Sequence, residues 1–413
     1  MAHHSPVIQR FLRYVQIDTQ SAEGAGQVPS TQKQLDLARL LVDELLAMGI
    51  TDARLDGHGY VYGTIPATPG LEALPALGFL AHMDTSPAVS GQGVTPRIVE
   101  GYDGGDIPLG DRWVLSPAVY PELRDYLGQD LIVTDGSTLL GADDKAGVAE
   151  MMAMAQVLTD NPAIPHGTLK LAFTPDEEVG RGTDFFDVAG WGAAYAYTVD
   201  GGALGELEYE NFNAASAQLT FLGVGAHPGG AKDRMRNALH LAMELHRMLP
   251  PAQTPEHTQG YEGFFHLDHL EGDVEEAKSH YIIRDHDRDR FEARKAQLTR
   301  IADYLNAKYG PGTVRLELAD SYYNMKEQIL PHMHLIDNAK QAMADLGIQP
   351  LVTPIRGGTD GARLSYAGLP CPNLCTGGHN YHSRFEYIPV QSMERVVSLL
   401  LRIVAIYGKG DRA

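Results

Sequence analysis

The 413-residue sequence has little of several features that mark particular classes of protein. It contains two cysteines, Cys371 and Cys375, which excludes a disulfide framework. Both lie in an apolar run, which favours buried, reduced thiols over half of a zinc site. No window approaches about 18 uninterrupted apolar residues, so no membrane-spanning helix is expected. The first five residues, Met-Ala-His-His-Ser, have no basic or apolar signal segment, and we expect a cytoplasmic protein.

Basic residues are scarce relative to acidic ones. Lys and Arg number 33 against 53 Asp and Glu, which gives a formal net charge of −20. This acidity opposes binding to nucleic acid and to anionic membranes, although it can also serve solubility alone. The hydrophobic fraction, 44%, is ordinary for a globular protein, and the length exceeds what one core usually supports. We therefore expect two domains, with neither nucleic acid nor membrane as a partner.

Short apolar runs alternate with helical patterns over residues 1–209 and 321–413. This alternation predicts an α/β fold, with a mainly parallel mixed sheet and helices on both faces. Residues 210–320 instead show the order β-α-β-β-α-β, which is the split βαβ, ferredoxin-like arrangement. We interpret this segment as an α+β domain inserted into the first domain.

Acidic and histidine side chains recur at the ends of the predicted strands. Open α/β sheets bind ligands just beyond the carboxyl ends of their strands. One such residue alone is more often a cap or a turn residue, but a whole set after buried strands favours a metal site. Zinc accepts histidine and carboxylate ligands together. The candidate metal ligands are His82, Asp144, Glu178, Asp200 and His382.

The stretch Leu-Leu-Gly-Ala-Asp-Asp-Lys-Ala-Gly, residues 139–147, joins a predicted strand to a predicted helix and contains two adjacent carboxylates. One of them can cap the N-terminus of the helix. The other, directed away from the helix, is better explained by a bound cation. We expect Asp144, which stands beside Lys145, to be this outward ligand.

The adjacent pair Glu177-Glu178 offers two functions at one strand end. Neighbouring side chains in a loop point in different directions, so one carboxylate can bind metal while the other faces a substrate as general base. A solvated pair without a cation is the alternative, and the apolar strand before the pair disfavours it. Asp84, two residues after His82, can accept a hydrogen bond from the imidazole of that histidine and fix its tautomer.

These stretches resemble the motifs of the M20 family of di-zinc metallopeptidases. The similarity extends along nearly the whole chain and is closer to the tripeptide aminopeptidases of that family. The motifs of the wider family are A-H-M-D-T (81–85), G-A-D-D-K-A-G (141–147), P-D-E-E-V-G (175–180), D-G-G (200–202) and H-S-R-F-E (382–386). The closer similarity is carried by G-A-H-P-G-G-A-K (225–232), Y-I-I-R-D-H-D (281–287), P-I-R-G-G-T-D-G-A (354–362) and C-P-N-L (371–374).

The resemblance implies an activity and a set of residue roles. The expected enzyme releases the N-terminal residue of tripeptides by means of a zinc-activated water. Glu177 would be the general base, and Asp84 the carboxylate behind a metal ligand. The inserted domain would be a lid or a dimerisation domain, and a homodimer is expected. The implied ligands of the two zinc ions are His82, Asp144 as the bridging carboxylate, Glu178, Asp200 and His382.

Three residues are candidates for contacting the peptide. The resemblance implies His227 and Arg284, both from the inserted domain. A guanidinium suits a carboxylate, so Arg284 would bind the C-terminus of the peptide and thereby select its length. A surface ion pair with a neighbouring aspartate explains Arg284 equally well from the sequence alone. Arg356 is the other candidate for binding the carboxylate. His379 stands where relatives typically have tyrosine, and a supporting role for it is open.

Other functions stay open at this point. Dipeptidases, carboxypeptidases and N-acyl-amino-acid deacylases of the same family share the metal motifs. A non-catalytic binding protein would be favoured by the loss of Glu177 or of a ligand, and none of these is lost. A phosphate-binding loop over residues 356–361 ranks low, because the Walker spacing and its lysine are missing.

Overall fold

The structure, a computed structural model, describes residues 5–409. The chain divides into two compact units. Unit 1 comprises Met1–Tyr209, Glu327–Thr353 and Thr359–Ala413, and unit 2 comprises Glu210–Lys326 and Pro354–Gly358. Residues 321–326 and 354–358, which the sequence pattern assigns to the first domain, therefore belong to unit 2.

Unit 1 is built on a mixed eight-stranded sheet with the order β1-β2-β8-β3-β9-β16-β10-β15. The central strands β8, β3, β9 and β16 run parallel and are almost entirely buried, as their apolar sequences predict. Strands β2 and β10 flank them in antiparallel pairing. The strands are β1 (Arg54–Leu55), β2 (Val61–Ile65), β3 (Leu77–His82), β8 (Leu169–Thr174), β9 (Tyr195–Gly201), β10 (Glu206–Glu208), β15 (Leu351–Val352) and β16 (Asn373–Cys375).

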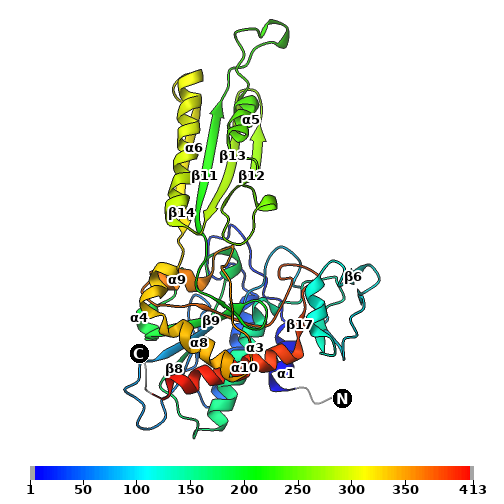
Figure 1. The fold of residues 1–413 in the computed structure, drawn as a ribbon, viewed down its shortest axis with the longest axis vertical. Coiled ribbons are helices and arrows are strands. Elements are labelled where there is room, and N and C mark those ends of the chain that lie inside the picture. The colour runs from blue at the N-terminus through cyan, green and yellow to red at the C-terminus, as the bar shows by residue number, and fades with distance from the viewer. Residues whose placement is uncertain (1–4, 410–413) are drawn as a thin grey trace. The chain divides into compact units, whose positions relative to one another are not determined.

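Helices cover both faces of this sheet, which confirms the predicted fold class (Figure 1). The long helix α3 packs on β3 and β9, and α1 and α10 pack on α3. On the other face, Trp191 of α4 and Leu364 of α9 join a core with Leu80 and Ala196 of the sheet. The main helices of unit 1 are α1 (Pro6–Tyr14), α2 (Gln34–Ala47), α3 (Ala142–Asp160), α4 (Val188–Trp191), α8 (His334–Asp345), α9 (Asp360–Tyr366) and α10 (Val390–Tyr407).

A smaller sheet in unit 1 brings two distant motifs together. Its order is β17-β7-β4, with Ile388 of β17 opposite Ile132 of β7. Strand β7 leads to the stretch 139–147, and β17 directly follows the motif at 382–386. The short strands of this region, which include a separate hairpin, are β4 (Arg97–Val99), β5 (Ile107–Leu109), β6 (Trp113–Leu115), β7 (Leu131–Val133) and β17 (Ile388–Pro389).

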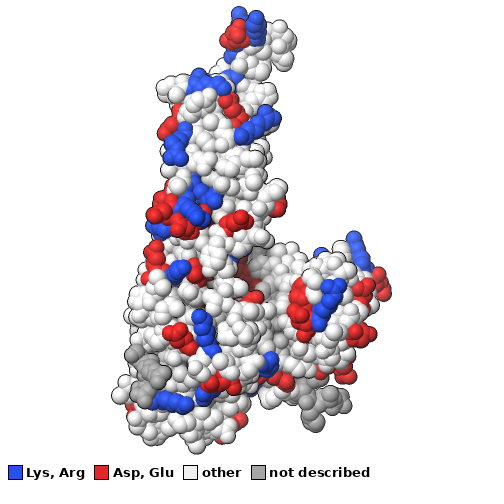
Figure 2. Space-filling model, in the orientation of Figure 1, with Lys and Arg blue, Asp and Glu red and all other residues white. Residues whose placement is uncertain are grey.

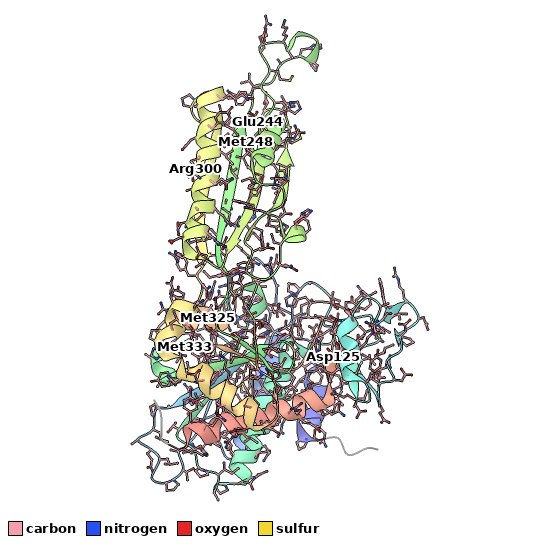
Figure 3. All side chains as sticks on the ribbon, viewed as in Figure 1. Asp125, Glu244, Met248, Arg300, Met325 and Met333 are labelled. Carbon is pink, nitrogen blue, oxygen red and sulfur yellow. The ribbon has the colours of Figure 1, made fainter. Side chains whose placement is uncertain are left out.

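Unit 2 has the predicted order β-α-β-β-α-β (Figure 1). Its four antiparallel strands lie in the order β12-β13-β11-β14. Alternate apolar residues of the sheet form one core with helices α5 and α6. Glu244 lies on α5 (Figure 3). Its carboxylate accepts hydrogen bonds from Lys308 and Tyr309 of α6. The elements are β11 (Asn213–Leu222), α5 (Ala238–Met248), β12 (Phe264–Gly272), β13 (Glu276–Asp285), α6 (Arg288–Tyr309) and β14 (Val314–Tyr322).

The surface charge is mixed. Acidic and basic side chains are interspersed over the face of the molecule seen in Figure 2. Among the described residues, none of the helices combines the length and the hydropathy that crossing a membrane requires.

Candidate metal centre

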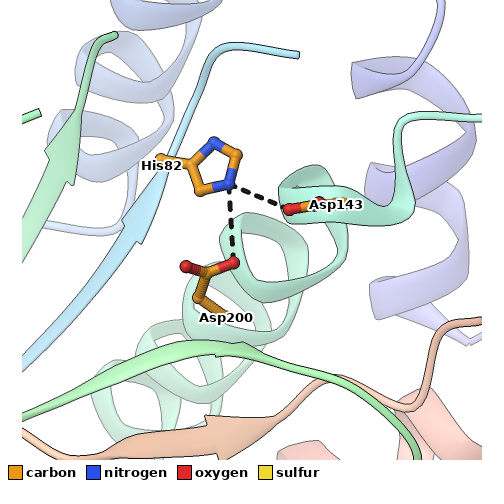
Figure 4. A group of neighbouring side chains, drawn as sticks. All are labelled: His82, Asp143 and Asp200. Carbon is orange, nitrogen blue, oxygen red and sulfur yellow. Dashed lines mark hydrogen bonds and ion pairs between the residues drawn. The ribbon is translucent and has the colours of Figure 1, made fainter. Parts of the chain in front are cut away.

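Two groups of potential metal ligands lie at the carboxyl ends of the central strands of unit 1, and they share Asp143. One group consists of His82, Asp143 and Asp200, and the other adds Glu178 and His382 to Asp143. His82 Nε2 lies 2.9 Å from Asp143 Oδ1 and 3.4 Å from Asp200 Oδ1 (Figure 4). His382 Nε2 lies 3.0 Å from Asp143 Oδ2 and 2.9 Å from Glu178 Oε2. Asp143 thus turns one oxygen to each group, as a carboxylate between two cations would.

Asp144 does not take the outward position expected for it. Its side chain is fully buried, and its two oxygens accept hydrogen bonds from the backbone N–H groups of His82 and Gly147, each at 3.1 Å. Asp143 and Asp144 both have non-helical backbone angles, so the regular helix starts after Asp144. Asp144 therefore caps α3 and Asp143 points away from it. The prediction of Asp144 as the bridging carboxylate is wrong, because the two adjacent carboxylates have exchanged roles.

Buried negative charge is concentrated in this centre. Burial, reinforced by the charge of Asp143, raises the pKa of Glu178 to about 7. Burial together with Asp200 raises the pKa of Glu177 well above its ordinary value. Hydrogen bonds to Asp143 and Glu178 raise the pKa of His382 to about 11. Crowded carboxylates of this kind hold protons or bind cations, because either relieves their mutual repulsion.

The donor set fits divalent cations such as zinc. Imidazole nitrogens and carboxylate oxygens are ligands that zinc accepts. Glu178 Oε1 is buried and has no hydrogen-bond partner among the described residues, although Oε2 of the same carboxylate contacts His382. A buried oxygen without a partner is costly unless it has a ligand. The residues of the two groups therefore suit a pair of cations that share Asp143.

Asp84 connects two of the strand ends. Its carboxylate accepts hydrogen bonds from the backbone N–H groups of Glu177 at 3.0 Å and Glu178 at 3.2 Å, both in the short helix η2 (Glu177–Val179). Asp84 Oδ1 also lies 3.4 Å from His82 Nδ1, and the backbone oxygen of Asp84 lies closer to that nitrogen, at 3.0 Å. One buried carboxylate thus orients a histidine and holds the loop that carries the two glutamates.

Glu386 is a further support that our sequence analysis did not single out. It is buried, and it accepts hydrogen bonds from the backbone N–H groups of Leu140 at 2.7 Å, Gly141 at 2.8 Å and Asp143 at 3.0 Å. These bonds hold the loop that presents Asp143 to both groups. The available signal was the position of Glu386 at the end of the H-S-R-F-E motif.

His379 lies outside both groups. Its Nε2 is 2.6 Å from the hydroxyl of Tyr126, and its ring stacks on Tyr387 with 4.7 Å between centroids. Burial lowers the pKa of His379 to about 4. A neutral ring packed among aromatic side chains is suited to supporting the terminal motif.

The expected substrate-contacting residues lie in unit 2, and they are not all together. Arg284 pairs with Ala214 at one end of β11, whereas His227 follows Leu222 at the opposite end of that strand. The eight steps from Ala214 to Leu222 span about 27 Å. An extended tripeptide spans only about 10 Å. One extended tripeptide is therefore too short to reach from Arg284 to the far end of β11, beyond which His227 lies in the same chain.

Arg284 and Arg356 lie next to each other but differ in what they hold. Arg284 Nη1 donates to the backbone oxygen of Arg356 at 3.0 Å, and its buried Nε has no partner among the described residues. The guanidinium of Arg356 donates to the backbone oxygens of Thr258, Gly260 and Glu262. Arg356 is thus committed to holding residues 258–262, while Arg284 keeps an unpaired N–H group.

Relatives of known name cover nearly the whole chain. A family model described as a peptidase dimerisation domain matches residues 209–313. Peptidase T of Desulfitobacterium hafniense (strain Y51) is 57% identical over 407 residues, which cover 98% of this chain and 99% of that protein. Peptidase T of Alkaliphilus oremlandii (strain OhILAs) is 53% identical over 406 residues, which cover 98% and 99%. The chain belongs to the peptidase T family. The resemblance inferred from the motifs is thereby confirmed.

Solved structures show that the fold of this peptidase T family member is shared along its full length. The aminopeptidase PepT from Bacillus cereus is 24% identical with a TM-score of 0.76, covering 97% of this chain and 98% of that chain. A tripeptidase from Staphylococcus aureus is 22% identical with a TM-score of 0.75, covering 98% of each chain. A dinuclear metal-binding peptidase of the M20 family from Bacillus subtilis is 13% identical with a TM-score of 0.67, covering 97% of each chain.

Proposed function

We propose that this protein is a metallo-aminopeptidase that releases the N-terminal residue from tripeptides. The observation that carries the proposal is the pair of ligand groups sharing Asp143, in a chain of the peptidase T family. Peptidase T relatives that match over nearly their full length favour this activity over that of dipeptidases, carboxypeptidases or deacylases with the same metal motifs. Action in the cytoplasm stays a prediction from the sequence.

The proposed cofactor is a pair of zinc ions. When bound, they would activate a water molecule and polarise the scissile carbonyl. Asp143 would bind both ions, and Asp84 would keep the tautomer of His82 that leaves Nε2 free as a ligand. The proposed ligands are His82, Asp143, Glu178, Asp200 and His382.

Glu177 is the proposed general base. Its carboxylate belongs to neither ligand group, while its backbone N–H is held by Asp84. Glu177 would take a proton from the attacking water and deliver it to the amine that leaves. The two neighbouring glutamates thus divide the work, with Glu178 as ligand and Glu177 as carrier of the proton.

A homodimer would resolve the distance between the proposed substrate-binding residues. Arg284, with its unpaired N–H group, is proposed to bind the C-terminal carboxylate of the peptide. His227 follows the far end of β11, beyond the reach of a tripeptide held by Arg284 of the same chain, so we propose that the His227 that contacts the peptide comes from a second copy. The match of residues 209–313 to a dimerisation domain supports this arrangement. Arg356 would orient Arg284 through the contact of its backbone oxygen.

The test combines metal analysis with a panel of peptides. The panel contains a free tripeptide, its C-terminal amide, its N-acetylated form and the corresponding dipeptide. We expect near two equivalents of metal per chain, rapid cleavage of the free tripeptide alone, and loss of activity with a chelator that zinc reverses. A protein that binds no metal at saturating zinc contradicts the proposal. Equal cleavage of the N-acetylated peptide would indicate another hydrolase of the same family.

A further inference from the structure

Asp176 opens the loop that carries Glu177 and Glu178, and it has no part in the chemistry proposed above. It is buried and has a positive φ of 58°, which is uncommon for a residue other than glycine. Its backbone N–H donates to Gln34 Oε1 at 3.2 Å, and its backbone oxygen accepts from the N–H of Arg181 at 2.9 Å. The backbone of the loop is therefore tied on both sides of Asp176.

The carboxylate of Asp176 receives three further hydrogen bonds, all from one short segment. The backbone N–H and the hydroxyl of Ser30 each donate to it at 2.5 Å. Gln34 Nε2 donates to Oδ1 at 2.6 Å. Hydrogen bonds to a charged acceptor are short and strong, and this network satisfies both carboxylate oxygens. The side chain of Gln34 thus contacts both the backbone N–H and the carboxylate of Asp176.

The segment that holds Asp176 also contacts the other loops of the metal centre. We call residues 17–34 the N-terminal brace. Ser21 N–H in the brace donates to the backbone oxygen of Thr85 at 3.2 Å. Lys145 Nζ donates to the backbone oxygen of Ile17 at 2.6 Å. The brace therefore supports all three loops that follow β3, β7 and β8, which are residues 82–85, 139–147 and 175–180.

We propose that Asp176 is a positioning residue, which Ser30 and Gln34 clamp so that Glu177 and Glu178 keep their places in the metal centre. Asp84 holds the two backbone N–H groups of these glutamates from one side of the loop. Asp84 thus holds the middle of the loop, and the anchor at Asp176 holds its start, so that the two together fix the direction of both side chains. Misplacement of a catalytic group by about 1 Å can cost about a hundredfold in rate. This inference rests on the proposed function.

An exchange of the two partners tests the clamp in the zinc-loaded, full-length protein. Asp176→Asn keeps a residue type that tolerates the positive φ, but its amide group opposes the amide of Gln34. Gln34→Glu sets two carboxylates face to face. We expect each single variant to lower kcat about 10- to 100-fold, with KM changed less than about threefold, and to weaken zinc binding. In the double variant, the carboxylate at position 34 can accept a hydrogen bond from the amide at position 176. The kcat of the double variant should therefore be about tenfold or more above that of the single variant with the lower kcat.

Thr68→Val is the matched control. It removes hydrogen bonds to Ile164 and from His166 at the other end of strands β3 and β8. Its melting temperature should fall while kcat and zinc affinity stay unchanged. Ser30→Ala is the mildest change within the clamp and should still lower kcat about threefold to tenfold. If the exchange variants do not fold, the kcat and the zinc affinity of Ser30→Ala test the clamp on their own.

Two results would overturn the clamp. One is a double variant no better than the weaker single variant. The other is a Ser30→Ala protein that, like the control, loses thermal stability but keeps its kcat and its zinc affinity, measured by competition with a chelator. If the variants give either of these results but the wild type binds zinc and cleaves tripeptides, the clamp fails and the proposed function stands. A wild type without bound zinc would instead contradict the proposed function itself.

Discussion

Both units place a histidine against an aspartate, in opposite surroundings. In unit 2, His280 lies on the sheet with its Nε2 2.8 Å from Ser216 Oγ and its Nδ1 2.6 Å from Asp268 Oδ1. The side chains of His280 and Asp268 are 29% and 30% exposed. In unit 1, His82 lies against Asp143 and is only 2% exposed. The same pair of residue types is thus partly exposed to water in one unit and enclosed in the other.

The difference shows what distinguishes the functional site. It is the presence of buried charges that no opposite charge balances, more than the pattern of residue types. The pair in unit 2 balances one imidazole against one carboxylate beside water and needs nothing further. A serine, a histidine and an aspartate in line also resemble a nucleophilic triad, but backbone N–H groups of β11 and β13 pair within the sheet and offer no oxyanion site. In unit 1 several buried carboxylates surround two histidines, and cations would restore the balance.

Asp143→Ala should have the largest effect, because Asp143 belongs to both ligand groups. We expect loss of both metal ions and a fall in kcat/KM of more than about 10³-fold, since metal-free protein forfeits most of an acceleration that is typically 10⁶-fold or greater. Asp144→Asn is the comparison variant, because Asp144 belongs to neither ligand group and asparagine keeps the shape of the side chain and one of its two acceptor oxygens. Metal analysis and peptide hydrolysis check both variants. Retention of metal by Asp143→Ala together with its loss in Asp144→Asn would restore the assignment made from the sequence.

Glu177→Gln should have the next largest effect and separates base from ligand within the adjacent pair. We expect kcat to fall about 10²- to 10⁴-fold, the usual contribution of a general base, while the metal content stays unchanged. Glu178→Gln, its neighbour, should lose metal as well as activity. If Glu177→Gln also lost its metal, the two glutamates would have to exchange roles.

His382→Ala and His379→Phe compare a ligand with its packed neighbour in the same motif. His382→Ala should weaken zinc binding at least about tenfold, since it removes a nitrogen that faces both Asp143 and Glu178. His379→Phe should leave zinc affinity unchanged, because His379 contacts Tyr126 and Tyr387 instead. Competition with a fluorescent chelator measures both affinities. A larger loss of zinc affinity in His379→Phe than in His382→Ala would contradict the proposed ligand set.

Glu150 sharpens the comparison, because it is a buried carboxyl group outside both ligand groups. It lies in α3, and neither of its oxygens has a partner among the described residues. Burial raises the pKa of Glu150 well above its ordinary value. A raised pKa in the folded state stabilises the protein below about pH 4.3, the unfolded value, and this stability is lost as the pH rises through the folded pKa.

Glu150→Gln should therefore flatten the decline in melting temperature between about pH 5 and pH 8, by a few degrees for a domain of this size. Zinc binding at neutral pH should not change. Melting curves of the variant and the wild type across this range provide the measurement. Parallel curves would show that Glu150 has a partner that keeps it charged.

His280→Ala should have the smallest effect of all. An exposed pair of this kind contributes about 0–1 kcal/mol, so the free energy of unfolding should fall by no more than that. Activity and metal content should match those of the wild type. A clear loss of activity would mean that the sheet of unit 2 takes part in the reaction, and the contrast between the two histidines would fail.

The parts of this protein that follow from local patterns could be predicted from its sequence. Buried strands read as apolar runs, and parallel strands end at one edge of a sheet, so the α/β class was accessible without coordinates. The same logic assembled four of the residues that the two ligand groups contain, which are His82, Glu178, Asp200 and His382. The order of strand and helix patterns over residues 210–320 likewise predicted the β-α-β-β-α-β arrangement of unit 2.

What escaped prediction depends on contacts between distant segments. The choice of Asp143 over Asp144 is made by the backbone at the start of α3, held by Glu386 from more than 240 residues away. Gln34 meets Asp176 across 142 residues of sequence. The distance from Arg284 to the far end of β11 appears only when the register of β11 and β13 is known. Sequence periodicity reports which face of an element is buried, whereas the direction of one side chain in a loop depends on the three-dimensional neighbours that hold the loop.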